Sequence, residues 1–311
     1  MTLVSRTTAV LCLVIVLAVA ATAGFALNSA GAASTISPAT PCIGAASPHT
    51  YQHVILIMEE NHSYKQVIGP AKYQTALAGR CGLASNHHAI SYPSLPNYVA
   101  LTSGGIPPNI AGRDCTPSGG CVTADPSIFT QSGSWKVYAE SMPKPCSRQN
   151  TPDGLYVPRH TAAPYFSGVV ACAQKDVPLG TPSSGGLHDD LASGALPRFA
   201  LIAPNTTDDA HGGCLTCADS WLARWMPAII NSRAYQSGST AVFITYDSDN
   251  GGSQNHVPTI VVAPAVPKGT VVETRFSHYS LLRTEEDILG IAGHLGGAAT
   301  APSMAAGFHL S

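Results

Sequence analysis

Short apolar runs recur along this chain, and several end in a cluster of polar residues. Residues 53–58 form the first run, which is followed directly by Glu59, Glu60 and Asn61. Short continuous runs of this kind are typical of strands that are buried on both faces, as in a parallel sheet. The sequence therefore predicts several buried strands. Four further runs lie at residues 135–139, 198–202, 241–246 and 259–262.

Helical patterns lie between these runs. Residues 219–230 place Trp221, Trp225 and Ile229 on one face of a helix, and residues 279–291 repeat the spacing with leucine and isoleucine. Strands that alternate with helices predict an α/β fold with a mostly parallel central sheet flanked by helices.

The first 33 residues predict a signal peptide. Arg6 precedes the apolar run 9–21, and Ala30, Gly31 and Ala32 offer a cleavage site. The alternative is an uncleaved membrane anchor, although no later stretch is long and apolar enough to span a bilayer. We therefore expect a secreted or cell-envelope protein, with no stable membrane insertion after the signal is cleaved.

One domain is expected after the signal. Residues 34–50 are rich in Ser, Pro and Ala and predict a flexible lead-in to a single domain at residues 51–311. Residues 105–195 contain long stretches rich in Gly, Pro and Ser, which we interpret as loop-rich insertions that frame the site. The formal net charge of −2 gives no electrostatic reason to expect nucleic acid as a partner.

Cysteine usage agrees with export. Of nine cysteines, Cys12 falls in the predicted signal, so eight remain after cleavage. An even number of cysteines in an exported chain predicts disulfides, although the sequence does not determine their pairing. Close spacing favours Cys115 with Cys121 and Cys214 with Cys217. The last pair also has the spacing of half a zinc site or a redox pair, but no second such pair completes a zinc site.

Carboxylates follow two of the predicted strands. Glu60 follows the run 53–58, and Asp247 follows the run 241–246. In open α/β sheets ligands bind beyond the carboxyl ends of the strands. Carboxylate oxygens there suit a divalent cation, so we predict that Glu60 and Asp247 bind one together.

Ser94 is the candidate nucleophile. It lies in the segment 92–98, at a predicted helix start where backbone amides favour a bound phosphate. The alternative is that Ser94 only caps the helix. A free serine hydroxyl is a weak nucleophile, and no Gly-x-Ser-x-Gly elbow surrounds this one. A divalent metal that lowers the pKa of the hydroxyl is therefore the expected activator.

Histidines are numerous, at twelve, and a lone histidine is more often structural than functional. His87 and His88 directly precede the Ser94 segment, but two adjacent side chains do not both face one site, so neither is assigned to it. The histidines that lie beside other polar candidates are His160, His211, His256 and His278.

Taken together, these segments resemble the phosphoesterase family of bacterial secreted acid phosphatases and phospholipase C-type enzymes, within the alkaline-phosphatase-like superfamily. The resemblance extends from about Val54 to Gly290 and implies an alkaline-phosphatase-like fold. Each matching segment is weak alone, whereas eight in the same order are specific. They are residues 58–63, 93–101, 156–160, 204–211, 219–222, 245–249, 255–259 and 277–279.

The resemblance also implies roles for single residues. Ser94 matches the nucleophile, Glu60 and Asp247 match metal ligands, and Asn61 matches an active-site residue near the phosphate. The positions expected to bind phosphate or to protonate the leaving group are His160, Asp209, His211 and His278.

The chain departs from the family after Asp247. Many members have a second acid directly after this position, where this chain has Ser248, and the next acid is Asp249. Asp249 is therefore a candidate metal ligand beside Glu60, Ser94 and Asp247, and the alternative is that it is a solvated loop residue. Carboxylates and neutral histidines suit calcium, magnesium, manganese or zinc, and the sequence does not choose among them.

These features predict a secreted, metal-dependent acid phosphatase. Ser94 would attack a phosphate monoester to give a phosphoserine, which water hydrolyses, with a histidine as general acid. We expect a small phosphorylated molecule or a phospholipid headgroup as the substrate. One alternative is a phospholipase C or phosphodiesterase, although that branch is generally longer. The other is a non-catalytic binding protein on a decayed phosphatase fold, which only Ser248 favours.

Overall fold

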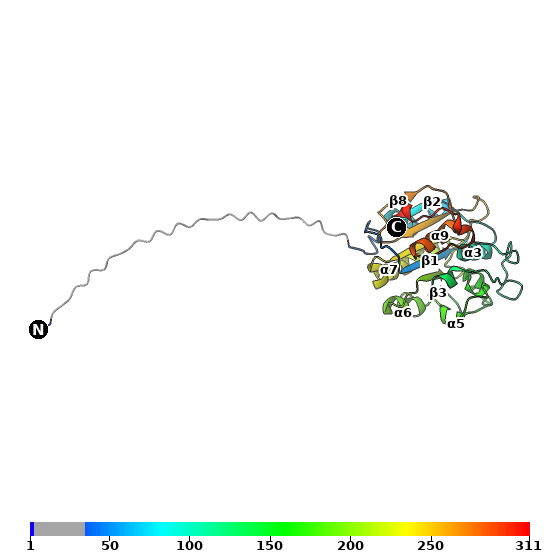
Figure 1. The fold of residues 1–311 in the computed structure, drawn as a ribbon, viewed down its shortest axis with the longest axis horizontal. Helices are drawn as coiled ribbons and strands as arrows, with labels where there is room; N and C mark the ends of the chain where they lie inside the picture. The colour runs from blue at the N-terminus through cyan, green and yellow to red at the C-terminus, as the bar shows by residue number, and fades with distance from the viewer. Residues whose placement is uncertain (3–34) are drawn as a thin grey trace. The chain divides into compact units, whose positions relative to one another are not determined.

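The computed structural model describes residues 1–2 and 35–311, and the folded part is shown in Figure 1. The predicted signal peptide therefore lies outside the described residues, apart from its first two, and remains a prediction. In the described part of the chain, no helix has the length and apolar character needed to cross a membrane.

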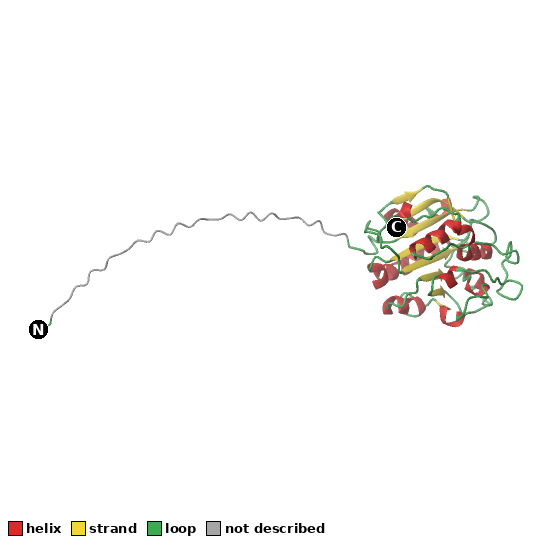
Figure 2. Ribbon diagram, in the orientation of Figure 1, coloured by secondary structure: helices red, strands yellow, loops and turns green. Residues whose placement is uncertain are grey.

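A nine-stranded sheet forms the centre of the described domain (Figures 1 and 2). Its strands are β1 (His53–Glu59), β2 (Gly82–His88), β3 (Trp135–Ala139), β4 (Asp176–Pro178), β5 (Phe199–Ala203), β6 (Thr240–Tyr246), β7 (His256–Val262), β8 (Thr270–Val272) and β9 (Phe276–Ser277). The spatial order is β4-β3-β5-β1-β6-β7-β2-β8, with β9 paired to β2.

The sheet is mostly parallel, as the sequence predicts. β7 is antiparallel to both of its neighbours, β6 and β2, and every other described pairing is parallel. The five apolar runs correspond to β1, β3, β5, β6 and β7. Residues Val54–Glu59 of β1 are all buried, which explains their continuous apolar pattern.

Helices flank this sheet (Figure 2). The α-helices are α1 (Tyr64–Val67), α2 (Lys72–Arg80), α3 (Ser94–Ser103), α4 (Ile128–Gln131), α5 (Cys172–Lys175), α6 (Gly186–Ser193), α7 (Leu215–Asn231), α8 (Arg233–Gln236) and α9 (His278–Ile288). Trp221 and Trp225 of α7 are fully buried, so the apolar face expected there packs into the core. α2 packs on α7, and α3 packs on α9.

Disulfides fasten the loops and the helix ends of the described chain. The four in the described residues are Cys42–Cys81, Cys115–Cys121, Cys146–Cys172 and Cys214–Cys217, which include both predicted pairs. Cys42 belongs to the predicted flexible lead-in, and its disulfide together with the bond from the Ile43 amide to the Pro264 carbonyl (3.2 Å) gives this part fixed contacts.

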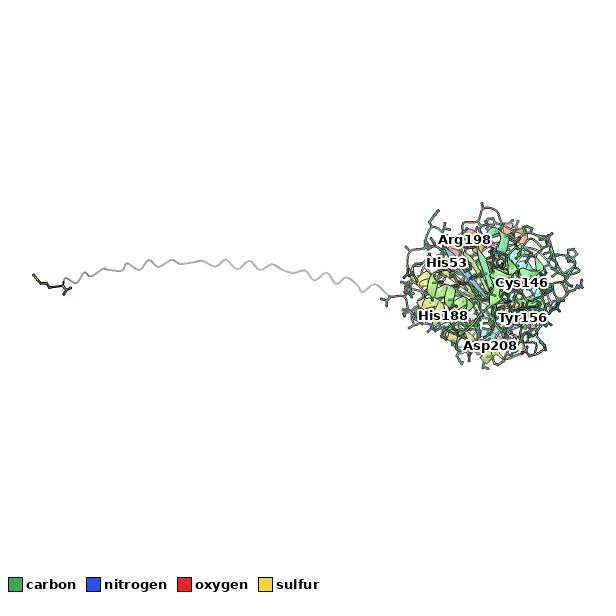
Figure 3. The ribbon with its side chains drawn as sticks, turned by 90° about the horizontal axis from the view of Figure 1, so that it is seen from below. His53, Cys146, Tyr156, His188, Arg198 and Asp208 are labelled. Atoms are coloured by element: carbon green, nitrogen blue, oxygen red, sulfur yellow. A yellow bond between two sulfur atoms is a disulfide. The ribbon has the colours of Figure 1, made fainter. Side chains whose placement is uncertain are left out.

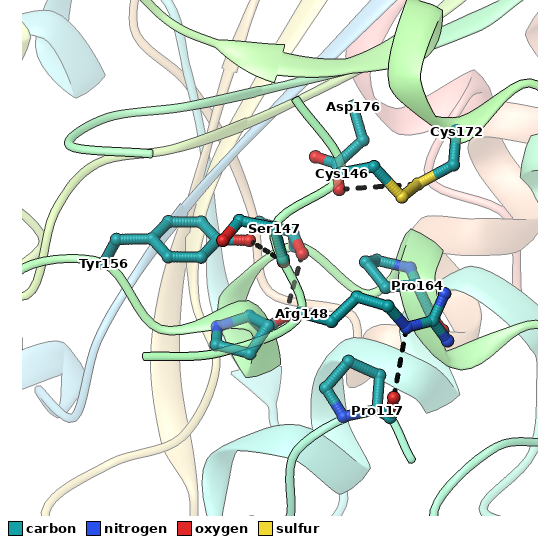
Figure 4. Close-up of a disulfide and its surroundings, with 10 residues drawn as sticks. Pro117, Cys146, Ser147, Arg148, Tyr156, Pro164, Cys172 and Asp176 are labelled. Carbon is teal, nitrogen blue, oxygen red and sulfur yellow. Dashed lines mark hydrogen bonds between the residues drawn. A yellow bond between two sulfur atoms is a disulfide. The ribbon is translucent and has the colours of Figure 1, made fainter. Parts of the chain in front are cut away.

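The insertion 105–195 is also fastened by hydrogen bonds beside its Cys146–Cys172 disulfide (Figure 4). Arg148 donates to the carbonyls of Pro117 (3.1 Å) and Pro164 (2.8 Å). Buried carbonyls need such partners, so one guanidinium holds two loops in place.

The carboxyl ends of the parallel strands meet at one edge of the sheet. There the Asp247 amide donates to the Glu59 carbonyl (3.0 Å), and the Glu60 amide donates to the Asp209 carbonyl (2.7 Å). Backbone hydrogen bonding thus continues past the ends of the strands and brings Glu60, Asp209 and Asp247 together. The amino ends of β1 and β5 lie at the opposite edge of the sheet. A separate cavity of 330 Å³ is found there, and its lining includes His53 and Arg198, which are labelled in Figure 3.

Candidate active site

Ser94 is the first residue of α3, and its side chain is buried, with the residue only 3% exposed. Its hydroxyl donates to Glu60 Oε2 at 2.9 Å. Pro93 occupies the N-cap position, and the Ser94 hydroxyl does not bond to the amides of the first turn. The hydroxyl is therefore directed at the carboxylate that directly follows β1 and not at the helix backbone, so the N-cap interpretation of Ser94 does not hold.

Asn61 connects the two strand-end carboxylates. Its backbone amide donates to Asp247 Oδ1 (3.0 Å), and its side-chain amide donates to Glu60 Oε2 (3.0 Å). Its side-chain oxygen accepts from Ser248 Oγ at 3.1 Å. Asn61 has φ of +52°, a left-handed conformation that is uncommon outside glycine and often found at functional sites.

Two histidines contact Glu60 from the insertion and from the loop after β5. His160 Nε2 lies 3.1 Å from Glu60 Oε1, and His211 Nδ1 lies 3.1 Å from Glu60 Oε2. The other ring nitrogen of His160 lies 3.0 Å from Asp209 Oδ2, and the ring of Tyr98 stacks on the imidazole with centroids 5.3 Å apart. Four side-chain groups therefore surround one glutamate.

The buried groups of the site have perturbed acidities. Burial, reinforced by the charge of Glu60, raises the pKa of Asp247 well above its ordinary value. Burial also raises the pKa of Asp209 to about 7 and lowers that of His160 to about 4. A hydrogen bond to Glu60 raises the pKa of His211. These shifts mark a dense cluster of acids from which water is excluded.

The donor set fits a divalent cation. Among the described residues, Glu60 Oε1 has only the contact with His160 Nε2 (3.1 Å), which does not have hydrogen-bond geometry, and no Lys or Arg side chain pairs with Glu60 or Asp247. Two unneutralised buried carboxylates cost several kcal/mol, which a bound cation would offset. Glu60, His160 and His211 offer ligand atoms within 4.8 Å of one another. Another group consists of Glu60 and Asp247, whose carboxylates both lie beside the Ser94 hydroxyl.

A pocket of 440 Å³ opens over Ser94. The His211 side chain is 34% exposed, so it is reachable from this pocket, whereas His160 is not. The lining residues are Asn61, Tyr92, Pro93, Ser94, Asp114, His211, Asp249, Asn250 and Gly251.

A family comparison decides the class of the protein. The model of the phosphoesterase family matches residues 70–292 of this sequence. The chain belongs to the phosphoesterase family. The resemblance inferred from the sequence is thereby confirmed, as is the predicted class of phosphoric ester hydrolase.

Curated relatives of this phosphoesterase include bacterial and fungal phosphatases. The chain is 30% identical over 258 residues to phosphatidylinositol-3-phosphatase of Mycobacterium tuberculosis, covering 81% of this chain and 82% of that protein. It is 27% identical over 266 residues to an acid phosphatase of Aspergillus fumigatus, covering 81% of this chain but only 57% of that enzyme. The chain therefore spans little more than half of its fungal relative.

Solved structures confirm the alkaline-phosphatase-like fold. A protein of the alkaline phosphatase superfamily from Vibrio parahaemolyticus superposes with a TM-score of 0.54 at 12% identity, covering 84% of this chain and 71% of that one. A putative sulfatase from Bacteroides thetaiotaomicron gives 0.53 at 14% identity, with 83% and 75% covered. At such identities the likeness concerns the fold alone.

In this phosphoesterase, Asp249 lies apart from the Glu60 cluster. Its carboxylate accepts from the backbone amides of Gly251 (2.6 Å), Ser253 (2.7 Å) and Asn255 (2.9 Å), and from the hydroxyl of Tyr92. These bonds lower the pKa of Asp249 although burial opposes them. Its oxygens therefore organise the turn that walls the pocket, and its proposed role as a metal ligand remains a prediction.

His278, expected to contact phosphate, lies behind Asp247. Its Nε2 is 2.7 Å from the backbone carbonyl of Asp247, and its Nδ1 is 3.2 Å from His87 Nε2. Both rings are fully buried, and burial lowers the pKa of His278 to about 4. The arrangement supports the backbone of Asp247, and the predicted contact with phosphate remains untested.

Sequence reasoning missed two residues near the pocket. Arg159 lies 3.4 Å from Asp114 and from His211 Nε2, and Asp114 accepts from the Leu95 amide at 2.9 Å. Arg159 could have been found from the sequence, because it lies in the matching segment 156–160. It is a cationic residue directly before His160, a candidate for phosphate binding. Asp114 has no such signal, because its insertion has no strand pattern.

Proposed function

We propose that this protein is a metal-dependent acid phosphatase that hydrolyses phosphate monoesters with Ser94 as the nucleophile. The observation that carries the proposal is the buried Ser94 hydroxyl, bonded to Glu60 Oε2 at the floor of an open pocket. The class of the relatives supports it, since both the mycobacterial and the fungal proteins are named as phosphatases.

Glu60 and Asp247 would hold the divalent ion with Ser94, because they are buried carboxylates beside its hydroxyl and, among the described residues, neither pairs with a Lys or Arg side chain. When bound, the ion would lower the pKa of the hydroxyl and neutralise charge on the phosphoryl group. Glu60, His160 and His211 form a second possible ligand group. We favour the first because Asp247 accepts from the Asn61 amide and the Ser248 hydroxyl but, among the described residues, faces no ionisable donor that would neutralise its charge.

His211 is the proposed general acid. It lines the pocket, its side chain is partly exposed, and Glu60 favours its protonated form through a 3.1 Å contact. Ser94 would release its hydroxyl proton to water, and Oγ would bond to phosphorus while the ester oxygen leaves with a proton from His211. Water would then attack the phosphoserine and return its proton to His211, releasing phosphate. The Ser94 oxygen would regain a proton from water when the phosphoserine bond is broken, which restores its hydroxyl. Arg159, 3.4 Å from His211, is placed to meet phosphate oxygens.

The test is turnover of a chromogenic phosphate monoester, before and after chelation and after adding back calcium, magnesium, manganese or zinc. Metal analysis of Glu60→Gln, Asp247→Asn and His160→Gln separates the two ligand groups. Loss of metal in the first two variants but not in the third supports the group around Ser94. Loss in Glu60→Gln and His160→Gln but not in Asp247→Asn supports the other. Full activity after exhaustive chelation would overturn metal dependence.

A phosphoinositide headgroup is a second candidate substrate. The observation that favours it is the 30% identity with the mycobacterial phosphatidylinositol-3-phosphatase over 82% of that protein. Comparing a short-chain phosphatidylinositol 3-phosphate with an aryl phosphate and an aryl phosphate diester distinguishes this candidate from a general phosphatase and from a diesterase.

Export is part of the proposal as well. Four disulfides in the described chain support folding in an oxidising compartment. Expression with the natural N-terminus, followed by sequencing of the N-terminus of the protein in the medium, tests whether cleavage falls near residue 33.

A further inference from the structure

A second cavity, of 290 Å³, adjoins the pocket over Ser94. The same two chain segments wall both spaces. Asn61 and Gly251 line the active-site pocket, while Ser63 and Gly252 line the second cavity. The complete lining of the second cavity is Ser63, Tyr64, Lys65, Gly252, Ser253, Gln254 and His256.

This lining is rich in hydrogen-bond donors and contains no carboxylate. Lys65 is exposed and forms no salt bridge with any described residue. The ends of Tyr64, Ser253 and Gln254 are likewise not bonded to other side chains in the described part of the protein. A lysine among neutral donors, without a competing acid, suits an anion. The active-site pocket differs, since Asp114 and Asp249 line it.

The cavity is formed in advance of any ligand. His256 lies between the rings of Tyr64 and His88, with centroids 4.9 and 5.0 Å apart, and its Nε2 donates to the Ser85 carbonyl at 2.8 Å. The opposite wall is the turn that Asp249 holds through three backbone amides. These contacts hold the walls of the cavity in place before an anion binds, so the freedom lost on binding is mainly that of the exposed Lys65 side chain.

We propose that this cavity binds a second anionic group, a phosphate or carboxylate, on a substrate whose reacting phosphate lies at Ser94. The inference rests on the proposed function, because it assumes that Ser94 marks the reaction centre. Asn61 and Ser63 are two residues apart, so the Cα atoms of these two lining residues lie within about 7 Å of each other. A compact bisphosphate spans such a distance, and the enzyme would prefer it to the corresponding monophosphate.

Binding is the appropriate test, because it is measured without turnover. Ser94→Ala protein with saturating metal would be titrated calorimetrically with fructose 6-phosphate and with fructose 1,6-bisphosphate. These probes share one carbon skeleton and differ in a single phosphate. The same titrations on Ser94→Ala proteins that also carry Lys65→Ala, Lys65→Arg or Lys72→Ala complete the set. Lys72 is the matched control, since it lies on α2 and donates to the Gly69 carbonyl, outside the cavity.

We expect the bisphosphate to bind about tenfold more tightly than the monophosphate, as one charge-assisted contact would give. Lys65→Ala should reduce this ratio to less than twofold, while Lys65→Arg and Lys72→Ala should keep it. A further titration with inorganic phosphate separates the sources of the anion. If the binding of inorganic phosphate depends on Lys65, the second cavity also binds free anions. If it does not depend on Lys65, the second cavity binds only an anionic group that is part of a substrate held at Ser94.

The failures are distinguishable. Suppose that the Ser94→Ala protein binds fructose 6-phosphate and fructose 1,6-bisphosphate equally, or that Lys72→Ala changes the ratio of the two affinities as much as Lys65→Ala does. The second site is then overturned and the proposed function stands. If the parent binds neither sugar although wild-type protein hydrolyses the chromogenic ester, the second site is again overturned. Absence of both binding and hydrolysis overturns both proposals.

Discussion

At the scale of single residues, Glu60 organises the site. Its two oxygens face Ser94, Asn61, His160 and His211 at 2.9–3.1 Å. One carboxylate thus contacts the proposed nucleophile, a second pocket residue and the proposed general acid. Its substitution would disturb all of them together, so the roles of single groups are better tested at the other members of the cluster.

Removal of the nucleophile is the first test. Ser94→Ala should abolish turnover of a chromogenic phosphate monoester, with a loss of several powers of ten, because no other hydroxyl in the pocket faces Glu60. Stability should change little, since Ser94 does not cap α3. Ser91→Ala, which removes a nearby hydroxyl bonded only to the Tyr92 carbonyl, is the matched control. A folded Ser94→Ala enzyme with near-normal turnover would exclude Ser94 as the nucleophile.

The second test concerns the acids that follow β6. Asp249→Ala should keep the metal but weaken substrate binding and stability, because its carboxylate holds three amides of the pocket wall. Ser248→Ala should keep the metal too and cost about 1 kcal/mol, the usual worth of its bond to Asn61. Metal analysis beside KM and kcat separates these roles. Metal loss in Asp249→Ala equal to that in Asp247→Asn would instead make Asp249 a ligand.

Which residues meet around Glu60 was largely predictable, whereas their contacts were not, and their chemical roles remain predictions. Glu60 and Asp247 could be chosen because each ends a buried strand, where a charge is unexpected. The function of Asp249 depends on turn geometry, which returns the chain so that three amides meet one carboxylate, and no pattern in the sequence encodes that. Likewise, His87 and His88 do face opposite sides of β2, but the buried one contacts His278.

At the scale of elements, apolar runs identified strands but not their directions. β1, β3, β5 and β6 are continuous buried runs, and their parallel pairing follows from the helices between them. Nine residues connect the end of β6 to the start of β7, and they contain no helix. A parallel crossover needs a longer connection, so β7 is antiparallel to β6. β2 was missed because its second half, Ser85–His88, is polar, although the strand lies between β7 and β8.

A disulfide next to the β5 loop provides an element-scale prediction. Cys214–Cys217 closes the first turn of α7, directly after the loop that carries Asp209 and His211. Replacing both cysteines by serine should cost about 2 kcal/mol in the chain-entropy estimate and should lower kcat, because His211 loses a fixed anchor three residues away. Urea unfolding and kcat on the same preparations provide the measurement.

Cys42–Cys81 is the control for that change. It spans 39 residues and fastens the lead-in to the end of α2, so its removal should cost more stability, about 4 kcal/mol, but leave kcat of the folded enzyme unchanged. Equal effects of the two double replacements on kcat would contradict a specific role for Cys214–Cys217.

At the scale of the whole molecule, acids are buried in several separate places. Burial is the main cause that raises the pKa of Glu140 and of Glu286 to about 7, and it raises those of Asp176 and Glu285 above their ordinary values. Each of these groups favours the folded state at low pH. Buried histidines act in the opposite direction, since stability is lost as pH falls toward the lowered pKa of His278, about 4. The pH dependence of the stability of the whole protein combines both effects. The difference between the wild type and a variant that lacks one of these groups is therefore more informative.

Glu285 gives the clearest difference. It is fully buried in α9, and among the described residues neither of its oxygens has a hydrogen-bond partner. Burial, with the nearby charge of Glu286, raises its pKa well above the ordinary value of 4.5. Below that value Glu285 is protonated in both states and costs little. Above it the unfolded chain ionises while the folded chain does not, so stability is lost as pH rises toward the folded pKa.

Glu285→Gln keeps the shape and removes the titration. The free energy of unfolding of this variant minus that of the wild type should therefore increase as the pH rises above about 4.5 and level off above the folded pKa of Glu285, as measured by urea unfolding at constant ionic strength and metal concentration. Glu273→Gln, at an exposed position, controls for effects of buffer and net charge and should give a flat difference. A flat difference for Glu285→Gln as well would mean that this carboxyl reaches water or a cation in the folded protein, and the expected preference of the fold for acid conditions would lose its strongest contribution.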